Sequence, residues 1–164
     1  MQTTIRFAYT TMPSPLGDLL LVAGEEGLAG VYTGGHKGGP AVHDGWRRDP
    51  AALAEPRRQL DAYFASELEA FDLPLAPRGT PWQLRVWEAL RAIPFATTAS
   101  YREIAARVCA PSAARAVGHA NGRNPLSIVV PCHRVIGAGG ALTGYGGGVE
   151  HKRWLLDHER GALL

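Results

Sequence analysis

The 164-residue chain has little cysteine: only Cys109 and Cys132 are present. Two cysteines are too few for a disulfide-stabilised scaffold, and no Cys-x-x-Cys spacing occurs, so the common zinc motifs are excluded. No uninterrupted apolar stretch approaches the roughly 18 residues of a membrane helix, and residues 1–6 lack the apolar core of a signal peptide. We therefore expect a cytoplasmic protein without a membrane segment or a metal site.

The two halves of the chain have net charges of opposite sign, although the net charge of the whole chain is only +2. Residues 1–79 contain 7 Lys and Arg against 10 Asp and Glu, giving −3, whereas residues 80–164 contain 10 against 5, giving +5. Nine of those ten basic residues are arginines, which suit bidentate contact with phosphate. The offset indicates a nucleic-acid partner for the C-terminal half or is random scatter, and charge alone does not decide.

The first third of the chain has the pattern of a small α/β domain. Ile5, Phe7 and Tyr9 alternate as in a strand, and two short apolar runs within 19–32 flank a Gly-Glu-Glu-Gly turn, which predicts a hairpin. Apolar residues at near-helical spacing predict a helix over 50–68. Two prolines and a glycine within 71–80 indicate a linker. We expect domains at 1–78 and 79–164.

The rest of the chain is predicted to be mostly helical. An apolar stripe follows Pro81 and ends at Pro94. Ser100 is a good N-cap for a helix over 101–108, with Glu103 completing a capping box. A helix over 113–121 is terminated by a glycine, and a last helix spans 149–159.

The segment 128–134 is an apolar run that ends in Cys132, followed by His133 and an arginine. A thiol is strongly nucleophilic only as the thiolate, and the pKa of free cysteine is about 8.5, so a neighbouring base or cation decides its reactivity. His133 can accept the proton directly or through water, with Glu159 or Asp157 orienting the imidazole. We expect these surroundings to make the sulfur anionic. The alternative is a buried, inert cysteine.

The segment 113–120 is a helix whose alanines and glycine leave a slim surface with one large cation, Arg115. Such a helix packs closely on a neighbour, or it presses against a duplex while Arg115 enters the base stack or fills the space of an extruded base. A short connection joins it to the helix over 101–108. The pair is typical of a helix-turn-helix, although that pattern alone is weakly specific.

Three further positions flank these motifs. Asn124 precedes a proline, which is ordinary turn chemistry or a brace between the slim helix and the cysteine loop. Tyr145 lies in the glycine-rich stretch 144–148, which is a plain surface loop or a lid over a flat ring; no Gly-Lys-Ser/Thr follows, so a P-loop is excluded. Tyr101 packs at a helix start or donates a proton to a leaving base.

Together these motifs resemble the O6-alkylguanine–DNA alkyltransferase family, the methylated-DNA–protein-cysteine methyltransferases. The resemblance is firm over residues 79–159, and the N-terminal part agrees mainly in size and order of elements. The segments that carry it are Gly79-Thr80-Pro81-Trp82, Ser100-Tyr101, Ala114-Arg115-Ala116-Val117-Gly118, Asn124-Pro125, Pro131-Cys132-His133-Arg134-Val135-Ile136, Tyr145 to Gly148 and Trp154-Leu155-Leu156.

The resemblance implies an N-terminal ribonuclease-H-like α/β domain and a mainly α C-terminal domain with a winged helix-turn-helix. It implies direct DNA repair, in which Cys132 accepts the alkyl (methyl) group from guanine O6 once and irreversibly, as a suicide methyltransferase without a cofactor. The implied partner is double-stranded DNA containing O6-alkylguanine, and a monomer is expected.

The resemblance also assigns roles to residues. His133 is expected to act through water as the base, oriented by Glu159, and Arg115 to replace the flipped guanine. Asn124 is the expected hinge beneath the cysteine, and Tyr101 assists protonation of the departing base and rotation of its phosphate. The expected DNA contacts are Ser112, Ala114, Arg115, Gly118, Arg123 and Arg134, and the expected alkylguanine pocket consists of Trp82, Val135, Tyr145 and Gly146.

Some features depart from the family pattern or fit another function. Gly146 occupies a position at which some relatives carry a serine, which leaves backbone amides to contact O6 and indicates a wider pocket. A cysteine hydrolase or acyltransferase shares Cys132 and His133 but needs an oxyanion hole and turns over continuously. A winged-helix module that only binds damaged DNA tolerates Cys132→Ser.

Overall fold

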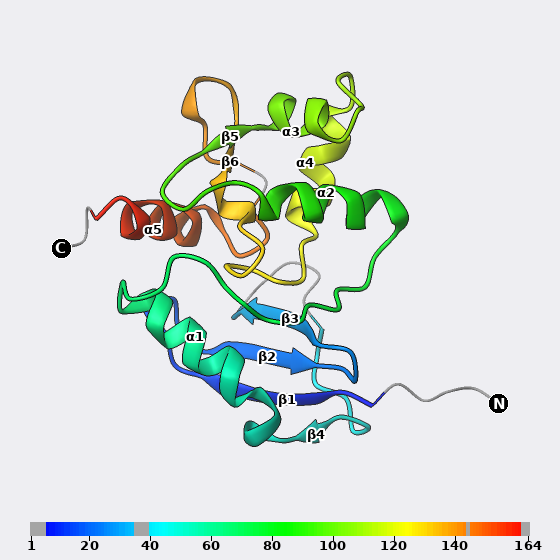
Figure 1. The fold of residues 1–164 in the computed structure, drawn as a ribbon, viewed down its shortest axis with the longest axis vertical. Coiled ribbons are helices and arrows are strands. Elements are labelled where there is room, and N and C mark those ends of the chain that lie inside the picture. The colour runs from blue at the N-terminus through cyan, green and yellow to red at the C-terminus, as the bar shows by residue number, and fades with distance from the viewer. Residues whose placement is uncertain (1–5, 35–39, 144, 162–164) are drawn as a thin grey trace.

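The chain folds as two halves that lie one above the other along the long axis of the molecule (Figure 1). The computed structural model describes residues 6–34, 40–143 and 145–161. A sheet covered by a helix forms the N-terminal half, and helices surround the segment that holds Cys132 in the C-terminal half. Among the described residues, no helix has the length and apolar character needed to cross a bilayer.

The N-terminal sheet has the strand order β3-β2-β1-β4. Its strands are β1 (Ala8–Met12), β2 (Leu19–Ala23), β3 (Leu28–Thr33) and β4 (Arg47–Arg48); β4 runs parallel to β1 and the other pairs are antiparallel. The predicted hairpin joins β2 to β3, where Gly24 N–H donates to the Gly27 carbonyl at 2.9 Å. Gly27 has φ +153°, and a Cβ there would lie 2.5 Å from the Pro74 carbonyl oxygen, so only glycine fits.

The apolar residues that alternate along β1 do not face the core. Ala8, Thr10 and Met12 are the buried residues of this strand, whereas Phe7 and Tyr9 point to the other side. There the two rings pack on Trp46, with centroid distances of 5.4 and 6.3 Å. An aromatic cluster therefore covers the outer face, and hydrophobicity alone could not distinguish it from the core. Ile5 lies outside the described residues.

The predicted helix over 50–68 is shorter than expected. A 3-10 turn, η1 (Pro50–Leu53), leads into α1 (Ala54–Phe64), and Ser66 has a positive φ of 61°. The expected linker pairs with the edge of the sheet, because Leu28 N–H donates to the Pro74 carbonyl at 2.9 Å and Ala76 N–H donates to the Leu28 carbonyl at 2.8 Å. The connection between the halves is therefore held in place.

The helices of the C-terminal half begin close to where the sequence predicts. They are α2 (Pro81–Arg91), α3 (Tyr101–Arg107), α4 (Ala114–Gly122) and α5 (Val149–Glu159). Thr80 and Gln83 form a reciprocal capping box on α2, and Ser100 Oγ accepts from Glu103 N–H on α3. Gly122 is the last residue of α4 rather than its terminator. Short β5 (Ala99–Ser100) and β6 (Val135–Ile136) pair in parallel.

Strand β3 connects the N-terminal half to the segment before Cys132 through backbone hydrogen bonds. Val31 N–H donates to the Pro125 carbonyl at 2.8 Å, and Ser127 N–H donates to the Val31 carbonyl at 3.2 Å. One apolar core continues across this junction, from Leu21 of the sheet through Val31 to Leu155 of α5. The two halves therefore fold against each other as one packed body, with the loop that precedes Cys132 at their junction.

Candidate active site and nucleic-acid face

Cys132 is the first residue of a 3-10 turn, η2 (Cys132–Arg134), and is only 2% exposed. The loop before it contains Ile128 at φ +76°, a strained conformation for a β-branched residue. Asn124 braces this loop, since its Nδ2 donates to the Val130 carbonyl at 2.9 Å and its Oδ1 accepts from Leu126 N–H at 3.0 Å. The asparagine fixes the backbone from which the thiol projects.

A second asparagine, which the sequence argument did not select, supports the same turn. Asn121 lies on the buried side of α4, and its Nδ2 donates to the Cys132 carbonyl at 3.3 Å. Because Asn121 and Asn124 are three residues apart at the end of one helix, both amides reach the loop. The bracing predicted for Asn124 is thus shared between two side chains of one helix end.

His133 and Glu159 form a fully buried pair in which Nε2 lies 2.6 Å from the carboxylate Oε2. The carboxylate also accepts from Arg134 Nε at 2.8 Å and from Arg134 Nη2 at 3.0 Å. Two more donors complete the set: the Ala96 N–H at 3.2 Å and the Tyr63 hydroxyl at 2.6 Å. Of the two acids that the sequence left open, Glu159 is therefore the one that reaches the imidazole.

The protonation states in this cluster follow from its surroundings. Burial would raise the pKa of Glu159, but the bonds and charges of His133 and Arg134 outweigh it and hold that pKa well below its usual range. Burial lowers the pKa of His133, although its bond to Glu159 opposes this. A neutral imidazole whose Nε2–H faces the carboxylate leaves Nδ1 as an acceptor. Nδ1 is buried and has no hydrogen-bond partner among the described residues.

The thiol of Cys132 is not anionic at rest, contrary to the expectation from the sequence. Burial raises its pKa to about 11, while a hydrogen bond from Asn124 and the charge of Lys152 act in the other direction. At neutral pH the sulfur therefore keeps its proton. Attack requires that this proton leave when the substrate arrives.

Lys152 is a buried cation near Cys132 that the sequence did not reveal. Its side chain is fully buried, and Nζ donates to the carbonyls of Val135 and Thr143, the latter at 2.7 Å. Burial lowers the pKa of Lys152 to about 8, and the Cys132 thiolate opposes this shift. The helical spacing of residue 152 from the apolar Leu155 and Leu156 was the available signal, because it places the lysine on the inner face of α5.

Tyr101 and Tyr145 both approach the cysteine. The Tyr101 hydroxyl donates to the Thr143 carbonyl at 2.6 Å, the same carbonyl that Lys152 binds. Burial raises the pKa of both phenols, and a thiolate at Cys132 raises them further, so both phenols lie within its electrostatic reach. Tyr145 is buried rather than lying on a plain surface loop. The structure thus brings most of the predicted catalytic set together.

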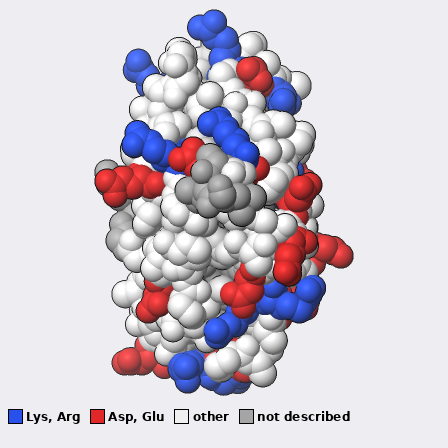
Figure 2. Space-filling model, turned by 90° about the vertical axis from the view of Figure 1, so that its left-hand side faces the viewer, with Lys and Arg blue, Asp and Glu red and all other residues white. Residues whose placement is uncertain are grey.

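The outer face of α4 is exposed and carries small and basic residues. Arg115 and Arg123 are exposed, as is Ser112 just before the helix, while Val117 and Ala120 on the other side are buried. Figure 2 shows another side of the molecule, the one on which α5 ends; there basic side chains predominate over the upper part and the two signs are mixed over the lower half. The exposed side of α4 is the candidate nucleic-acid face.

The sequence was then compared with known proteins. Residues 7–77 match the family model of the 6-O-methylguanine DNA methyltransferase ribonuclease-like domain, and residues 81–161 match the DNA binding domain of the same family. A methylated-DNA–protein-cysteine methyltransferase of Methanosarcina acetivorans is 50% identical over 92% of this chain and 97% of its own length. The crystal structure of Mycobacterium tuberculosis OGT in complex with DNA superposes with a TM-score of 0.89 at 50% identity, covering 94% of this chain and 93% of that chain.

The chain belongs to the 6-O-methylguanine DNA methyltransferase family. Its two halves are the ribonuclease-like domain and the DNA-binding domain of that family, and the matched ranges meet within the linker. A protein of Mycolicibacterium paratuberculosis, also named methylated-DNA–protein-cysteine methyltransferase, is 51% identical over 93% of this chain and 92% of its own length.

In this methyltransferase Arg134 does not have the predicted place on the DNA face. Its side chain is 7% exposed, and its guanidinium bonds Glu159 and donates to the Ile93 carbonyl at 2.8 Å. Three of its five N–H donors are used on Glu159 and Ile93, and the burial of its side chain keeps it away from a phosphate on the surface. The prediction of Arg134 as a DNA contact is therefore wrong.

Trp82 also has contacts that differ from the prediction. Its indole N–H donates to the Ala116 carbonyl at 3.3 Å, and the Arg85 guanidinium lies over its ring. Trp82 lines a cavity of about 320 Å³ together with His119 and Ala120, and neither Cys132 nor Tyr145 contributes to that cavity. These contacts make Trp82 an anchor of α4 rather than a wall of the cysteine site.

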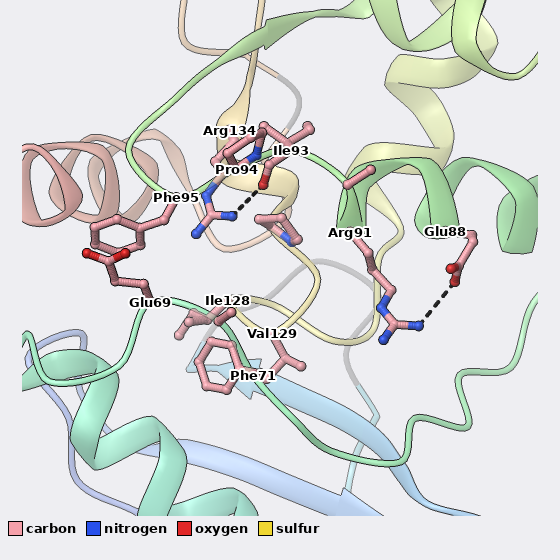
Figure 3. Close-up of a pocket in the computed structure, with 13 residues that line it drawn as sticks. Glu69, Phe71, Glu88, Arg91, Ile93, Pro94, Phe95, Ile128, Val129 and Arg134 are labelled. Carbon is pink, nitrogen blue, oxygen red and sulfur yellow. Dashed lines mark hydrogen bonds and ion pairs between the residues drawn. The ribbon is translucent and has the colours of Figure 1, made fainter.

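A second cavity of about 500 Å³ lies behind the cysteine loop, between the two halves (Figure 3). Phe71 of the linker, Phe95 and Val129 contribute apolar walls, and the guanidinium of Arg134 reaches the Ile93 carbonyl at its upper side. No cluster of three or more His, Cys, Asp or Glu side chains suited to a metal ion occurs within residues 6–34, 40–143 and 145–161.

Proposed function

We propose that this protein repairs O6-alkylguanine in double-stranded DNA by transferring the alkyl group to the Sγ of Cys132. The observation that carries the proposal is the buried Cys132 next to a neutral His133 whose Nε2 is bound to Glu159. Membership of a family whose relatives are named methylated-DNA–protein-cysteine methyltransferases supports the same reaction. No metal or cofactor is required by this chemistry.

The transfer is a displacement at carbon. The Cys132 proton passes to Nδ1 of His133, directly or through water, and Glu159 stabilises the imidazolium that forms. The new bond joins Sγ to the alkyl carbon while the bond from that carbon to guanine O6 breaks, and the electron pair stays on the guanine. Because the product is a thioether, water has no easy route back to the thiol, so each molecule reacts once.

Residues around the thiol receive the base. Tyr101 supplies a proton to the departing guanine; its phenol already donates to a carbonyl acceptor, and the incoming base competes for that donor. Backbone groups of Cys132 and Val135 read the base edge, Tyr145 stacks near the ring, and Gly146 leaves room beside the alkyl group. Asn124 holds the loop in position while the base enters.

The DNA-binding element is a winged helix-turn-helix made of α3, α4 and the segment that follows β6. Arg115 occupies the space of the flipped guanine, and Ser112, Ala114 and Arg123 contact the backbone. A Cβ on Gly118 would meet the Tyr101 ring at 3.6 Å, an ordinary van der Waals distance, so packing inside the protein does not require glycine there. Close approach of the duplex explains the small residue. Binding is salt-sensitive and involves a monomer in the cytoplasm.

Intact-mass measurement tests the reaction. After mixing with a duplex that contains O6-methylguanine, the protein gains one methyl group on the peptide with Cys132 and saturates at one per molecule. Cys109→Ser, which removes the exposed thiol, reacts normally, and Cys132→Ser does not react but still binds DNA. Unmodified protein beside intact lesion contradicts the proposal, and continuing turnover favours a hydrolase.

A further inference from the structure

One donor to the Glu159 carboxylate comes from the other half of the molecule. The Tyr63 hydroxyl lies 2.6 Å from Oε2, and His133 Nε2 lies 2.6 Å from the same oxygen. Tyr63 belongs to α1 of the ribonuclease-like domain and is 96 residues from Glu159 in sequence. Arg134 Nη2 also donates to Oε2, at 3.0 Å. Three donors therefore share one carboxylate oxygen, and His133 is the base of the proposed alkyl transfer.

Packing holds Tyr63 rigidly in this position. Its side chain is fully buried, and its ring makes edge contacts with Phe95 and His158 at centroid distances of 6.4 and 5.2 Å. The backbone adds a second link to α5, because His158 Nε2 lies 2.8 Å from the Tyr63 carbonyl oxygen. In Figure 1, α1 lies below α5 on the same side of the molecule. The phenol cannot leave the carboxylate without breaking this packing.

The phenol is a permanent donor. Burial raises the pKa of Tyr63 far above its usual value, and the neighbouring charge of Glu159 adds to the shift, so the hydroxyl keeps its proton. A donor on Oε2 takes up part of the negative charge that otherwise stabilises a protonated His133. The other charged or titratable groups facing this pair are Arg134, Lys152, Cys132, Tyr145 and His158.

We propose that Tyr63 is a positioning residue for the alkyl transfer: through its hydrogen bond to Glu159, the ribonuclease-like domain keeps His133 neutral and ready to accept the Cys132 proton. The proposal rests on the function proposed above. It gives the N-terminal domain a direct part in the chemistry through Tyr63.

The test is the pH dependence of alkylation in Tyr63→Phe, which removes one oxygen and keeps the ring. Without the phenol, Glu159 stabilises the imidazolium more strongly, so the pKa of His133 rises. The midpoint of the acid limb in the pH–rate profile for O6-benzylguanine then moves to a higher pH, by about half a pH unit to one pH unit. On this acid limb the variant is three- to tenfold slower than the wild type, and above the limb the two rates are equal. Tyr9→Phe, in the same domain, is the matched control and stays at the wild-type profile.

A second variant is expected to shift the acid limb in the opposite direction. Site-specific 3-fluorotyrosine at position 63 keeps the packing but makes the phenol a stronger donor, so the acid limb moves to lower pH. This measurement also applies if Tyr63→Phe fails to fold. The titration of Lys152 falls on the alkaline side and is common to all variants.

Three results overturn the inference: an unchanged profile in Tyr63→Phe, a loss of rate that is the same at every pH, or a fluorotyrosine shift in the same direction as that of phenylalanine. Failure of the proposed function is a separate outcome, because the wild type itself then leaves O6-benzylguanine intact. In that case the same profiles, measured as iodoacetamide labelling of Cys132 in the Cys109→Ser background, still decide the role of Tyr63.

Discussion

The cluster around Glu159 and the outer face of α4 lie in the same domain but are built in opposite ways. The carboxylate is buried and has five hydrogen-bond donors, from Tyr63, Ala96, His133 and twice from Arg134. The outer face of α4 is exposed and carries small side chains, and its cationic side chains are exposed to solvent. Burial strengthens electrostatic interactions and fixes geometry, which the chemistry needs, whereas a DNA surface must stay open for a ligand. We therefore expect substitutions in the buried cluster to lower stability, and substitutions on the outer face of α4 to weaken repair of duplex DNA.

The largest expected effect is on the buried side. Arg134→Met leaves the Glu159 carboxylate buried without its cation, so the free energy of unfolding falls by about 3–5 kcal/mol in urea denaturation. The salt dependence of DNA binding by the folded protein does not change, since Arg134 makes no phosphate contact. Arg115→Met, on the exposed face, is the control and changes stability by less than about 0.5 kcal/mol. Normal stability with a lower salt slope would restore Arg134 to the DNA face.

The second effect concerns the exposed side. Arg115→Ala slows repair of O6-methylguanine in a duplex by about 10- to 100-fold, because roughly 1–3 kcal/mol of support for the extruded nucleotide is lost. Reaction with free O6-benzylguanine stays close to the wild-type rate, because no base has to be extruded. Arg153→Ala, an exposed cation on α5, serves as the control. Equal losses on both substrates would argue against a role of Arg115 in the duplex.

The most gradual expected effect is a pH dependence that originates from Lys152. Its pKa is about 8 in the folded protein and 10.5 as a reference, so the unfolded chain binds more protons between these values. The contribution of Lys152 to the free energy of unfolding therefore rises with pH from 8 toward 10.5, by at most about 1.4 kcal/mol per unit. Lys152→Met lacks this rise, and the difference between the two proteins in urea denaturation at each pH measures it. The raised pKa of Cys132 acts on both proteins but does not cancel fully, because the charge of Lys152 lowers the pKa of that thiol.

Local signals in the sequence were enough to locate the helices of the C-terminal half. Ser100 and Pro81 mark helix starts correctly, and the final helix has the predicted bounds Val149–Glu159, because capping and spacing act within a few residues. The orientation of β1 was not predictable in this way. Phe7 and Tyr9 are as apolar as core residues, and only the contact with Trp46 shows which side they occupy.

The amino-acid sequence by itself determined the chemical identity of the site: a cysteine followed by histidine, a slim helix with Arg115, and an asparagine before the cysteine loop. Tertiary structure alone decided which groups meet. In the folded chain Glu159 rather than Asp157 contacts the imidazole, and Arg134 is buried at this carboxylate instead of lying on the DNA face. Lys152 and Tyr63 also lie beside the site. The physical reason is distance along the chain: Tyr63 and Glu159 are 96 residues apart, and no local pattern records a contact that only packing of the two halves creates.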